Sequence, residues 1–273
     1  MRDSLSAFTT FGIGGAAKKL TIARSRTEFA DAAARGALVL GRGSNVLVSD
    51  DGYDGEVAIN RYAGVSRSGV CVTAASGTTL TSLCGYLKEQ GLSGMEWAVG
   101  IPSSVGGAVI MNAGAFGGSV SDRLICAEVL RGGDIITLGA DEFGFGYRTS
   151  SLAVGDVVVS ATFALETCDP CIIATLHSEY NAARRAKQPI GRSAGSVFKN
   201  HEGMSAGALI EAAGFKGYRI GGAEVSHKHA NIIVNTGGAT ACDVVSIVRT
   251  IKTELEARGT PVEEEIVYIG EFN

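Results

Sequence analysis

The strongest constraint in this sequence is the glycine-rich stretch GIPSSVGGAVIMNAGAFGG at residues 100–118. It holds six glycines and no charged residue, which is unlike an exposed flexible linker. The whole chain has 38 glycines in 273 residues, about twice the usual share, yet only four prolines and no three-residue glycine repeat. Because glycine has no Cβ, it allows a close approach of backbone to ligand. We therefore expect a globular fold whose backbone lies against a large flat or phosphate-bearing ligand.

Charge and hydropathy exclude several classes of protein. The net charge of −4 and the lack of a basic block argue against a nucleic-acid-binding protein. No run approaches the 18 apolar residues of a spanning helix, and the N-terminus lacks the apolar core of a signal peptide. Six cysteines are sparse for a disulfide-stabilised chain of this length. We expect a cytoplasmic protein without a membrane segment and without an obligatory protein partner.

The hydrophobic periodicity predicts an α+β protein, and the length of 273 residues predicts roughly two domains. Turn-forming residues at 167–170 mark the expected boundary. Helices are predicted near 27–36, 79–91, 171–186 and 240–259, and strands near 20–23, 37–40, 46–48, 57–60, 70–74, 157–163 and 231–235.

A second glycine motif, GRGSN at residues 41–45, follows a predicted strand. A dinucleotide-binding Rossmann fingerprint needs a third glycine and a following helix, but Val46 takes the glycine's place and begins another apolar run. Two interpretations remain, a plain tight turn and a nest of backbone N–H groups that binds phosphate. No nucleoside-triphosphate P-loop motif occurs in the chain.

Three further patterns are predicted to be incidental. Cys168 and Cys171 form a C-x-x-C, but no second pair follows, as a zinc site would need. Ser193 lies in a G-x-S-x-G that lacks the strand–turn–helix context of a serine hydrolase. His227 and His229 have no evident third metal ligand, so no metal site is predicted.

Four segments together resemble the UDP-N-acetylenolpyruvoylglucosamine reductase (MurB) family. The resemblance runs from Thr9 to Gly270 and is specific, because the segments occur in family order. They are GRGSNVLVSD at 41–50, GIPSSVGGAVIMNAGAFG at 100–117, GSVFKN at 195–200 and SHKHANIIVN at 226–235. The absence of a long insertion resembles the shorter family type, which lacks a tyrosine-bearing loop that covers the substrate.

The resemblance implies an FAD-binding domain of the vanillyl-alcohol-oxidase type, followed by a smaller α+β substrate-binding domain. We expect the first at 1–167, with two subdomains divided near 60–68, and the second at 168–273, with the last strand a candidate to return to the FAD-binding domain. The implied reaction is the reduction of UDP-N-acetylglucosamine enolpyruvate to UDP-N-acetylmuramate, a peptidoglycan precursor, with NADPH as reductant and FAD as hydride carrier. Two alternatives are another FAD-dependent oxidoreductase of this fold and a noncatalytic protein that binds sugar nucleotide or flavin.

The same resemblance assigns the chemistry to three residues. Hydride addition to the enolpyruvyl group leaves negative charge that needs a cation and then a proton. Arg148, in the family's Tyr-Arg-x-Ser pattern, is the implied cation, since a guanidinium holds a carboxylate through two bonds. Ser196 is the implied proton donor. Glu265, five residues before Gly270, is the implied catalytic glutamate, with Glu263 as the alternative if the register differs.

The remaining assignments concern binding. Three positions depart from the family. Ser103 replaces a glycine, which would crowd the loop if a positive φ were required there, His201 replaces a proline, and Ile232 replaces a common phenylalanine. Expected substrate ligands are Tyr147, Lys187, Asn200, Ser226 and His229. Expected flavin ligands are Gly41, Arg42, Gly43, Ser44, Asn45, Gly100, Ser103, Ser104, Gly106, Gly107, Asn112 and Gly114.

Overall fold

The computed structural model describes residues 4–200 and 204–272. Contacts between Cα atoms divide the chain into two compact units that are not continuous in sequence. Unit 1 comprises residues 1–19, 43–55 and 185–273, and unit 2 comprises residues 20–42 and 56–184. The units therefore divide the chain at other places than the single boundary near residue 167. The assignment of flavin and substrate to the halves 1–167 and 168–273 stays a prediction.

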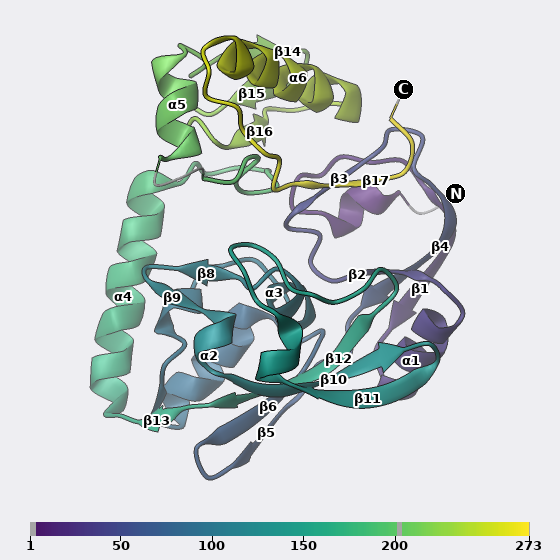
Figure 1. The fold of residues 1–273 in the computed structure, drawn as a ribbon, viewed down its shortest axis with the longest axis vertical. Helices are drawn as coiled ribbons and strands as arrows, with labels where there is room; N and C mark the ends of the chain where they lie inside the picture. The colour runs from purple at the N-terminus through teal and green to yellow at the C-terminus, as the bar shows by residue number, and fades with distance from the viewer. Residues whose placement is uncertain (1–3, 201–203, 273) are drawn as a thin grey trace. The chain divides into compact units, whose positions relative to one another are not determined.

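Unit 2 is built around a five-stranded antiparallel sheet with the order β11-β10-β12-β6-β5 (Figure 1). Its core joins the sheet to the apolar faces of α2 and α3. Thr79 caps α2 by accepting a hydrogen bond from Ser82 N, so the helix begins where the strand signal ends. The elements are β5 (Val65–Ser68), β6 (Cys71–Ala75), α2 (Leu80–Glu89), α3 (Val105–Ile110), β10 (Leu124–Arg131), β11 (Asp134–Gly139) and β12 (Val157–Ala164).

Short elements complete unit 2. The hairpin of β8 (Gly114–Ala115) and β9 (Gly118–Ser119) lies within the glycine-rich stretch. α1 carries Phe29 into a small core with Leu130 and Val159. A second sheet has the order β1-β4-β2, and two of its strands, β1 and β4, run through both units. The other elements are β1 (Ala17–Ala23), α1 (Arg26–Ala34), β2 (Leu38–Leu40), β4 (Tyr53–Asn60), β7 (Leu92–Ser93), η2 (Glu96–Ala98), η3 (Val120–Asp122), η4 (Ala140–Phe143) and β13 (Glu166–Thr167).

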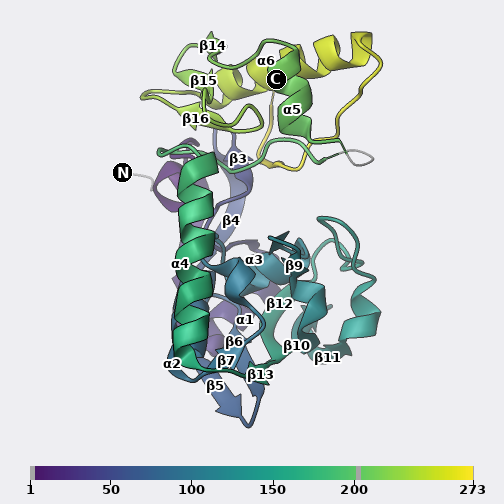
Figure 2. The ribbon, with the colours of Figure 1, turned by 90° about the vertical axis from the view of Figure 1, so that its left-hand side faces the viewer.

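Unit 1 consists of two small sheets and two helices around one apolar core. α6 packs on β14 and β15 and contacts α5 (Figure 2). β17 pairs in parallel with β3, so Val267 lies beside Val46 from the other end of the chain. The elements are η1 (Leu5–Phe8), β3 (Val46–Val48), α5 (Ala206–Ala212), β14 (Arg219–Ile220), β15 (Ala223–Val225), β16 (Ile233–Asn235), α6 (Ala241–Ala257) and β17 (Val267–Ile269).

The four predicted helices are confirmed as α1, α2, α4 (Pro170–Lys187) and α6. α4 begins at Pro170, where a missing N–H costs nothing, and its last three residues belong to unit 1. The hairpin of β10 and β11 went unpredicted, although Gly132-Gly133 between two apolar runs is a recognised hairpin signal. The short helices α3 and α5 also went unpredicted, because six or seven residues show too little periodicity.

Candidate active site

The GRGSN loop connects β2 to β3, so the strand–loop–strand context predicted for it is confirmed. Gly43 has a φ of +60°, and a Cβ there would lie 2.5 Å from the carbonyl oxygen of Phe8. Within the described parts of the chain, the backbone N–H groups of residues 41–45 donate no hydrogen bond to the protein. Five consecutive unused donors are the feature that an anion-binding nest requires. The phosphate-binding interpretation is therefore favoured over a plain turn.

The second glycine motif meets the first within unit 2. A Cβ on Gly41 would lie 2.3 Å from Ser104 Oγ, so only glycine allows this contact. The start of α3 is held by backbone bonds from Val105 N to Thr78 O and from Gly106 N to Ser76 O. The backbone of the two motifs thus forms one surface of unit 2 at Gly41 and Ser104, as a bound cofactor would require.

Positive charge lies beside this surface. Arg61 Nη1 donates to the carbonyl oxygen of Gly41 at 2.9 Å. Burial lowers the pKa of Arg61, and the neighbouring charges of Arg42 and Arg24 lower it further. Guanidinium groups that repel one another are stabilised by an anion between them. The residues present therefore fit a cofactor that carries phosphate.

The serine at position 103, where the family has glycine, does not crowd the loop. Among residues 4–200 and 204–272, the positive-φ residues other than glycine are Asn112, Phe116 and Arg148, and Ser103 is not among them. Its hydroxyl donates to the carbonyl oxygen of Ser104 at 3.1 Å. The backbone at this position accepts any L-residue, so the departure at Ser103 carries no strain. The second departure, His201, lies outside the described residues.

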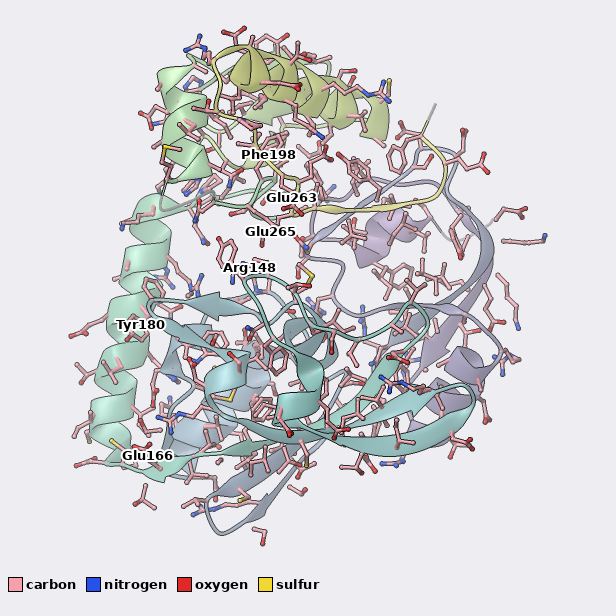
Figure 3. The ribbon with its side chains drawn as sticks, viewed as in Figure 1. Arg148, Glu166, Tyr180, Phe198, Glu263 and Glu265 are labelled. Atoms are coloured by element: carbon pink, nitrogen blue, oxygen red, sulfur yellow. The ribbon has the colours of Figure 1, made fainter. Side chains whose placement is uncertain are left out.

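Arg148 lies at the tip of a tight turn in unit 2. Gly146 and Thr149 exchange backbone hydrogen bonds on either side of Tyr147 and Arg148, and Arg148 has a φ of +57°. Its Nη2 donates to the carbonyl oxygen of Gly114 at 2.9 Å. Buried Asn112 donates from Nδ2 to Gly146 O at 3.1 Å. The turn that carries the implied catalytic cation is therefore fastened to the second glycine motif (Figure 3).

Unit 1 brings Ser196 and Glu265 onto neighbouring segments. Glu265 N donates to the carbonyl oxygen of Val197, the residue after Ser196, at 2.8 Å. Asn45 Nδ2, from the GRGSN loop, donates to the carbonyl oxygen of Glu265 at 2.9 Å. Figure 3 shows Glu263 and Glu265 on the same segment below Phe198. Three separate sequence motifs thus converge within unit 1.

The two candidate glutamates differ in their surroundings. Glu263 forms an ion pair with Lys199, and its side chain is 73% exposed. Glu264, between them, pairs with Lys252. Glu265 is half-buried. The surface ion pair of Glu263 favours Glu265 as the functional residue, although the catalytic assignment itself stays a prediction.

The SHKHAN motif forms a turn rather than a continued strand. β15 ends at Val225, and Ser226 Oγ accepts hydrogen bonds from the backbone N–H groups of Lys228 and His229. His229 Nδ1 is buried without a hydrogen-bond partner within the described residues. Burial, then the positive charge of Lys216, lowers the pKa of His229, so the imidazole is neutral near pH 7. A neutral buried ring with an unused nitrogen is consistent with the predicted role in binding.

Of the other predicted substrate ligands, one makes a hydrogen bond to the backbone and two are exposed. Asn200 Oδ1 accepts from Ala206 N at the start of α5. Tyr147 is 52% exposed, and its ring centroid lies 5.1 Å from the Cζ of Arg148. Lys187 is exposed at the end of α4. The structure leaves Tyr147 and Lys187 accessible, and their roles stay predictions.

Asn231 anchors the segment that carries Ser196. Its Oδ1 accepts from Phe198 N at 2.9 Å and its Nδ2 donates to Phe198 O at 2.7 Å, both in the interior. Asn231→Ala would leave two buried backbone groups unsatisfied, at about 1–3 kcal/mol each. We expect the free energy of unfolding to fall by about 2–6 kcal/mol in urea denaturation. The control, exposed Gln188→Ala, should change it by less than about 0.5 kcal/mol, and equal values for both variants would contradict this prediction.

Two family models match separate parts of this chain. Residues 21–139 match the FAD binding domain family, and residues 186–269 match the family "UDP-N-acetylenolpyruvoylglucosamine reductase, C-terminal domain". The UDP-N-acetylenolpyruvoylglucosamine reductase of Trichormus variabilis is 44% identical over 98% of this chain and 85% of its own length. The chain belongs to the UDP-N-acetylenolpyruvoylglucosamine reductase family. The reductase of Geobacter metallireducens is 39% identical over 99% of this chain and 94% of its own length.

A solved structure of the family supports the fold as well. The MurB reductase of Thermus caldophilus matches with a TM-score of 0.88 and 38% identity, over 98% of both chains. The expected order of an FAD-binding domain followed by the family's C-terminal domain is therefore confirmed, as are the mixed α and β content and FAD as cofactor. In the described parts of the chain, no helix has both the length and the apolar character needed to cross a bilayer.

Three residues of unit 2 that contact one another were not predicted from the sequence: Phe116, Tyr180 and Arg184. Phe116 stacks on Tyr180, and Arg184 lies over the ring of Phe116. Tyr180 lies within the helix predicted near 171–186, at a spacing that favours the apolar face of that helix. The spacing of Tyr180 and Arg184, one helical turn apart, was a signal that both lie on one face.

Proposed function

We propose that this chain catalyses the NADPH-dependent reduction of UDP-N-acetylglucosamine enolpyruvate to UDP-N-acetylmuramate in peptidoglycan precursor synthesis. The observation that carries this proposal is that the chain joins an FAD-binding domain to the family's own C-terminal domain. Relatives named for this reaction cover nearly the whole chain. The alternative of another flavin oxidoreductase is disfavoured because residues 186–269 match the family's own domain rather than an unrelated one.

FAD, when bound, would supply the transfer of hydride from NADPH to the enolpyruvyl group. In this chain the loop 41–45 and the stretch 100–114 supply the residues that hold it, through the unused N–H groups and the close backbone approach described above. The ligands are those assigned from the sequence, from Gly41 to Asn45 together with Gly100, Ser103, Ser104, Gly106, Gly107, Asn112 and Gly114.

Side chains of the protein stabilise the negative charge that develops on the substrate and transfer the proton to it. Arg148 holds the substrate carboxylate and stabilises the negative charge that develops beside it, since a guanidinium is permanently charged. The Ser196 hydroxyl donates the proton to the carbon next to that carboxylate. A serine is a weak acid in water, so its effect depends on positioning. Glu265, whose backbone N–H donates to the carbonyl oxygen of Val197 beside Ser196, supplies a carboxyl group for the proton transfer.

Binding of the sugar nucleotide falls to Tyr147, Lys187, Asn200, Ser226 and His229. NADPH and the sugar nucleotide are intracellular metabolites, so the enzyme works in the cytoplasm, and the reaction needs neither a membrane nor a second protein. The compact chain fits the family type without a tyrosine-bearing covering loop.

The proposal is tested by anaerobic stopped-flow absorbance on the purified holoenzyme. NADPH should bleach the flavin band, and UDP-N-acetylglucosamine enolpyruvate should restore it. A flavin that is reoxidised only by oxygen would remove the substrate assignment and leave another flavin oxidoreductase. Protein that binds flavin and sugar nucleotide without turnover would favour the noncatalytic alternative.

The two glutamates give a matched pair of variants. Glu265→Gln should lower kcat by roughly 100-fold, because a positioned carboxyl group contributes about that much to proton transfer. Glu263→Gln should stay within about twofold of the parent, because it loses only an exposed ion pair with Lys199. The measurement is steady-state NADPH oxidation with the sugar nucleotide saturating. The reverse order of effects would assign the catalytic role to Glu263.

A further inference from the structure

Three residues other than glycine have positive φ in the described parts of the chain, and all three lie in one hydrogen-bonded part of unit 2. They are Asn112 at +41°, Phe116 at +52° and Arg148 at +57°. Left-handed backbone is unfavourable for residues that carry a Cβ, and an aromatic residue there is an outlier. Such strain persists only where surrounding contacts impose it, and it gathers at functional sites. The three residues are connected through the segment 112–121 and the turn 146–149 of unit 2.

Phe116 occupies the turn of the β8–β9 hairpin. Phe116 and Gly117, with φ of +52° and +82°, are its two central residues, and both have positive φ as a tight two-residue hairpin turn requires. Asparagine or glycine is the usual first residue of such a turn. Phenylalanine has no conformational advantage at this turn position. We therefore attribute its presence there to the contacts that its ring makes.

The ring of Phe116 is held by α4. It stacks on Tyr180 with a centroid distance of 4.5 Å and an interplanar angle of 7°. The Cζ of Arg184 lies 5.0 Å from the same ring centroid. Arg184 is fixed in turn by donating to the carbonyl oxygens of Val99 at 2.8 Å and Trp97 at 3.0 Å. We name Phe116, Tyr180 and Arg184 the α4 clamp, and Figure 3 marks Tyr180 on this helix.

The clamped hairpin bears directly on Arg148. Gly114, in β8, offers the carbonyl oxygen that accepts from Arg148 Nη2. Asn112 binds the base of the Arg148 turn through Gly146 O, and its Oδ1 accepts from Ser121 N just beyond β9. The direction of the Gly114 carbonyl group thus depends on the hairpin that Phe116 closes. A shift of the hairpin would move the guanidinium of Arg148.

We infer that Phe116, held by Tyr180 and Arg184, is a positioning residue that sets the orientation of the Arg148 guanidinium through the Gly114 carbonyl group. This inference rests on the proposed function in so far as Arg148 acts on the enolpyruvyl substrate. The α4 clamp affects the step that needs Arg148, reoxidation of the flavin by the sugar nucleotide. It leaves reduction of the flavin by NADPH unaffected, because that step places no negative charge beside Arg148.

The test compares Phe116→Gly, Tyr180→Leu and Tyr180→Phe in the holoenzyme. Glycine adopts the turn's positive φ freely, so Phe116→Gly keeps the hairpin and removes only the ring. We expect Phe116→Gly and Tyr180→Leu to slow reoxidation by the sugar nucleotide roughly 10- to 100-fold, the effect of a misplacement near 1 Å. Tyr180→Phe keeps the aromatic stack on Phe116 and should retain the parent rate. Ile172→Ala, at an exposed position on the same helix, is the matched control.

A second measurement is independent of activity. The side-chain N–H signals of Arg148, assigned by their loss in Arg148→Lys, report in NMR whether the guanidinium is ordered. They should broaden or average in Phe116→Gly and remain sharp in Tyr180→Phe. If the parent flavin is not reoxidised by the sugar nucleotide, the proposed function fails, and the Arg148 signals alone decide the inference. Unchanged signals in Phe116→Gly, or equal slowing of both half-reactions, would overturn it.

Discussion

Arg148→Ala should keep its FAD, accept hydride from NADPH at nearly the parent rate and lose about 10²- to 10³-fold in reoxidation by the sugar nucleotide. The loss corresponds to about 3–4 kcal/mol, the usual effect of removing one charged donor from a developing anion. Backbone strain does not contribute to the difference between the parent and the variant. Arginine and alanine both carry a Cβ and have the same conformational cost at a φ of +57°. Anaerobic stopped-flow absorbance separates the two half-reactions.

Arg148→Lys should fall between the parent and the alanine variant. It keeps the positive charge but loses the flat, two-donor geometry that matches a carboxylate. Arg67→Ala is the control, since among the described residues that guanidinium donates hydrogen bonds only to Gly69 and Gln90 near the β5–β6 turn. If Arg148→Ala slowed both half-reactions equally, its role would be in flavin binding or local structure, and the substrate assignment would be withdrawn.

The sequence predicted the local character of the chain well. Glycine spacing identified two loops that lie against each other at Gly41 and Ser104, and their role in binding the cofactor stays a prediction. The apolar residue after Asn45 excluded a helix there, which β3 confirms. The four longer helices were predicted because each shows several turns of apolar periodicity and ends at a glycine or proline. These features depend on neighbours in sequence, so a single chain reveals them.

Long-range arrangement could not be obtained in the same way. Periodicity cannot show that residues 43–55 join residues 185–273 in one unit, because that depends on the pairing of β3 with β17. The surroundings of Glu263 were equally hidden, since Lys199 lies 64 residues away in sequence. Nor does any local pattern predict a positive φ at Phe116 or Arg148. Tertiary contacts impose that conformation against intrinsic preference.

Ser196→Ala should produce the largest loss of activity, roughly 10²- to 10⁴-fold in kcat, the range for a positioned general acid. The change is structurally mild. In the described residues the Ser196 hydroxyl makes no hydrogen bond to the protein, and the bridge of Ser196 to Ile232 uses backbone atoms only. The variant should therefore fold, bind FAD and be reduced by NADPH as the parent is. The measurement is turnover with the sugar nucleotide, in H₂O and in D₂O.

Ser193→Ala is the matched control for Ser196→Ala. Ser193 lies three residues earlier, in the G-x-S-x-G, and its Oγ accepts only a long bond from Gly195 N at 3.5 Å. It should retain parent turnover, and a fluorophosphonate probe should not label Ser193, as expected if its motif is incidental. Ser196→Cys should recover part of the rate, because a thiol is a stronger acid than a hydroxyl and can still donate a proton. Parent turnover in Ser196→Ala would assign the proton to another donor, and Glu265 would then be the acid to test.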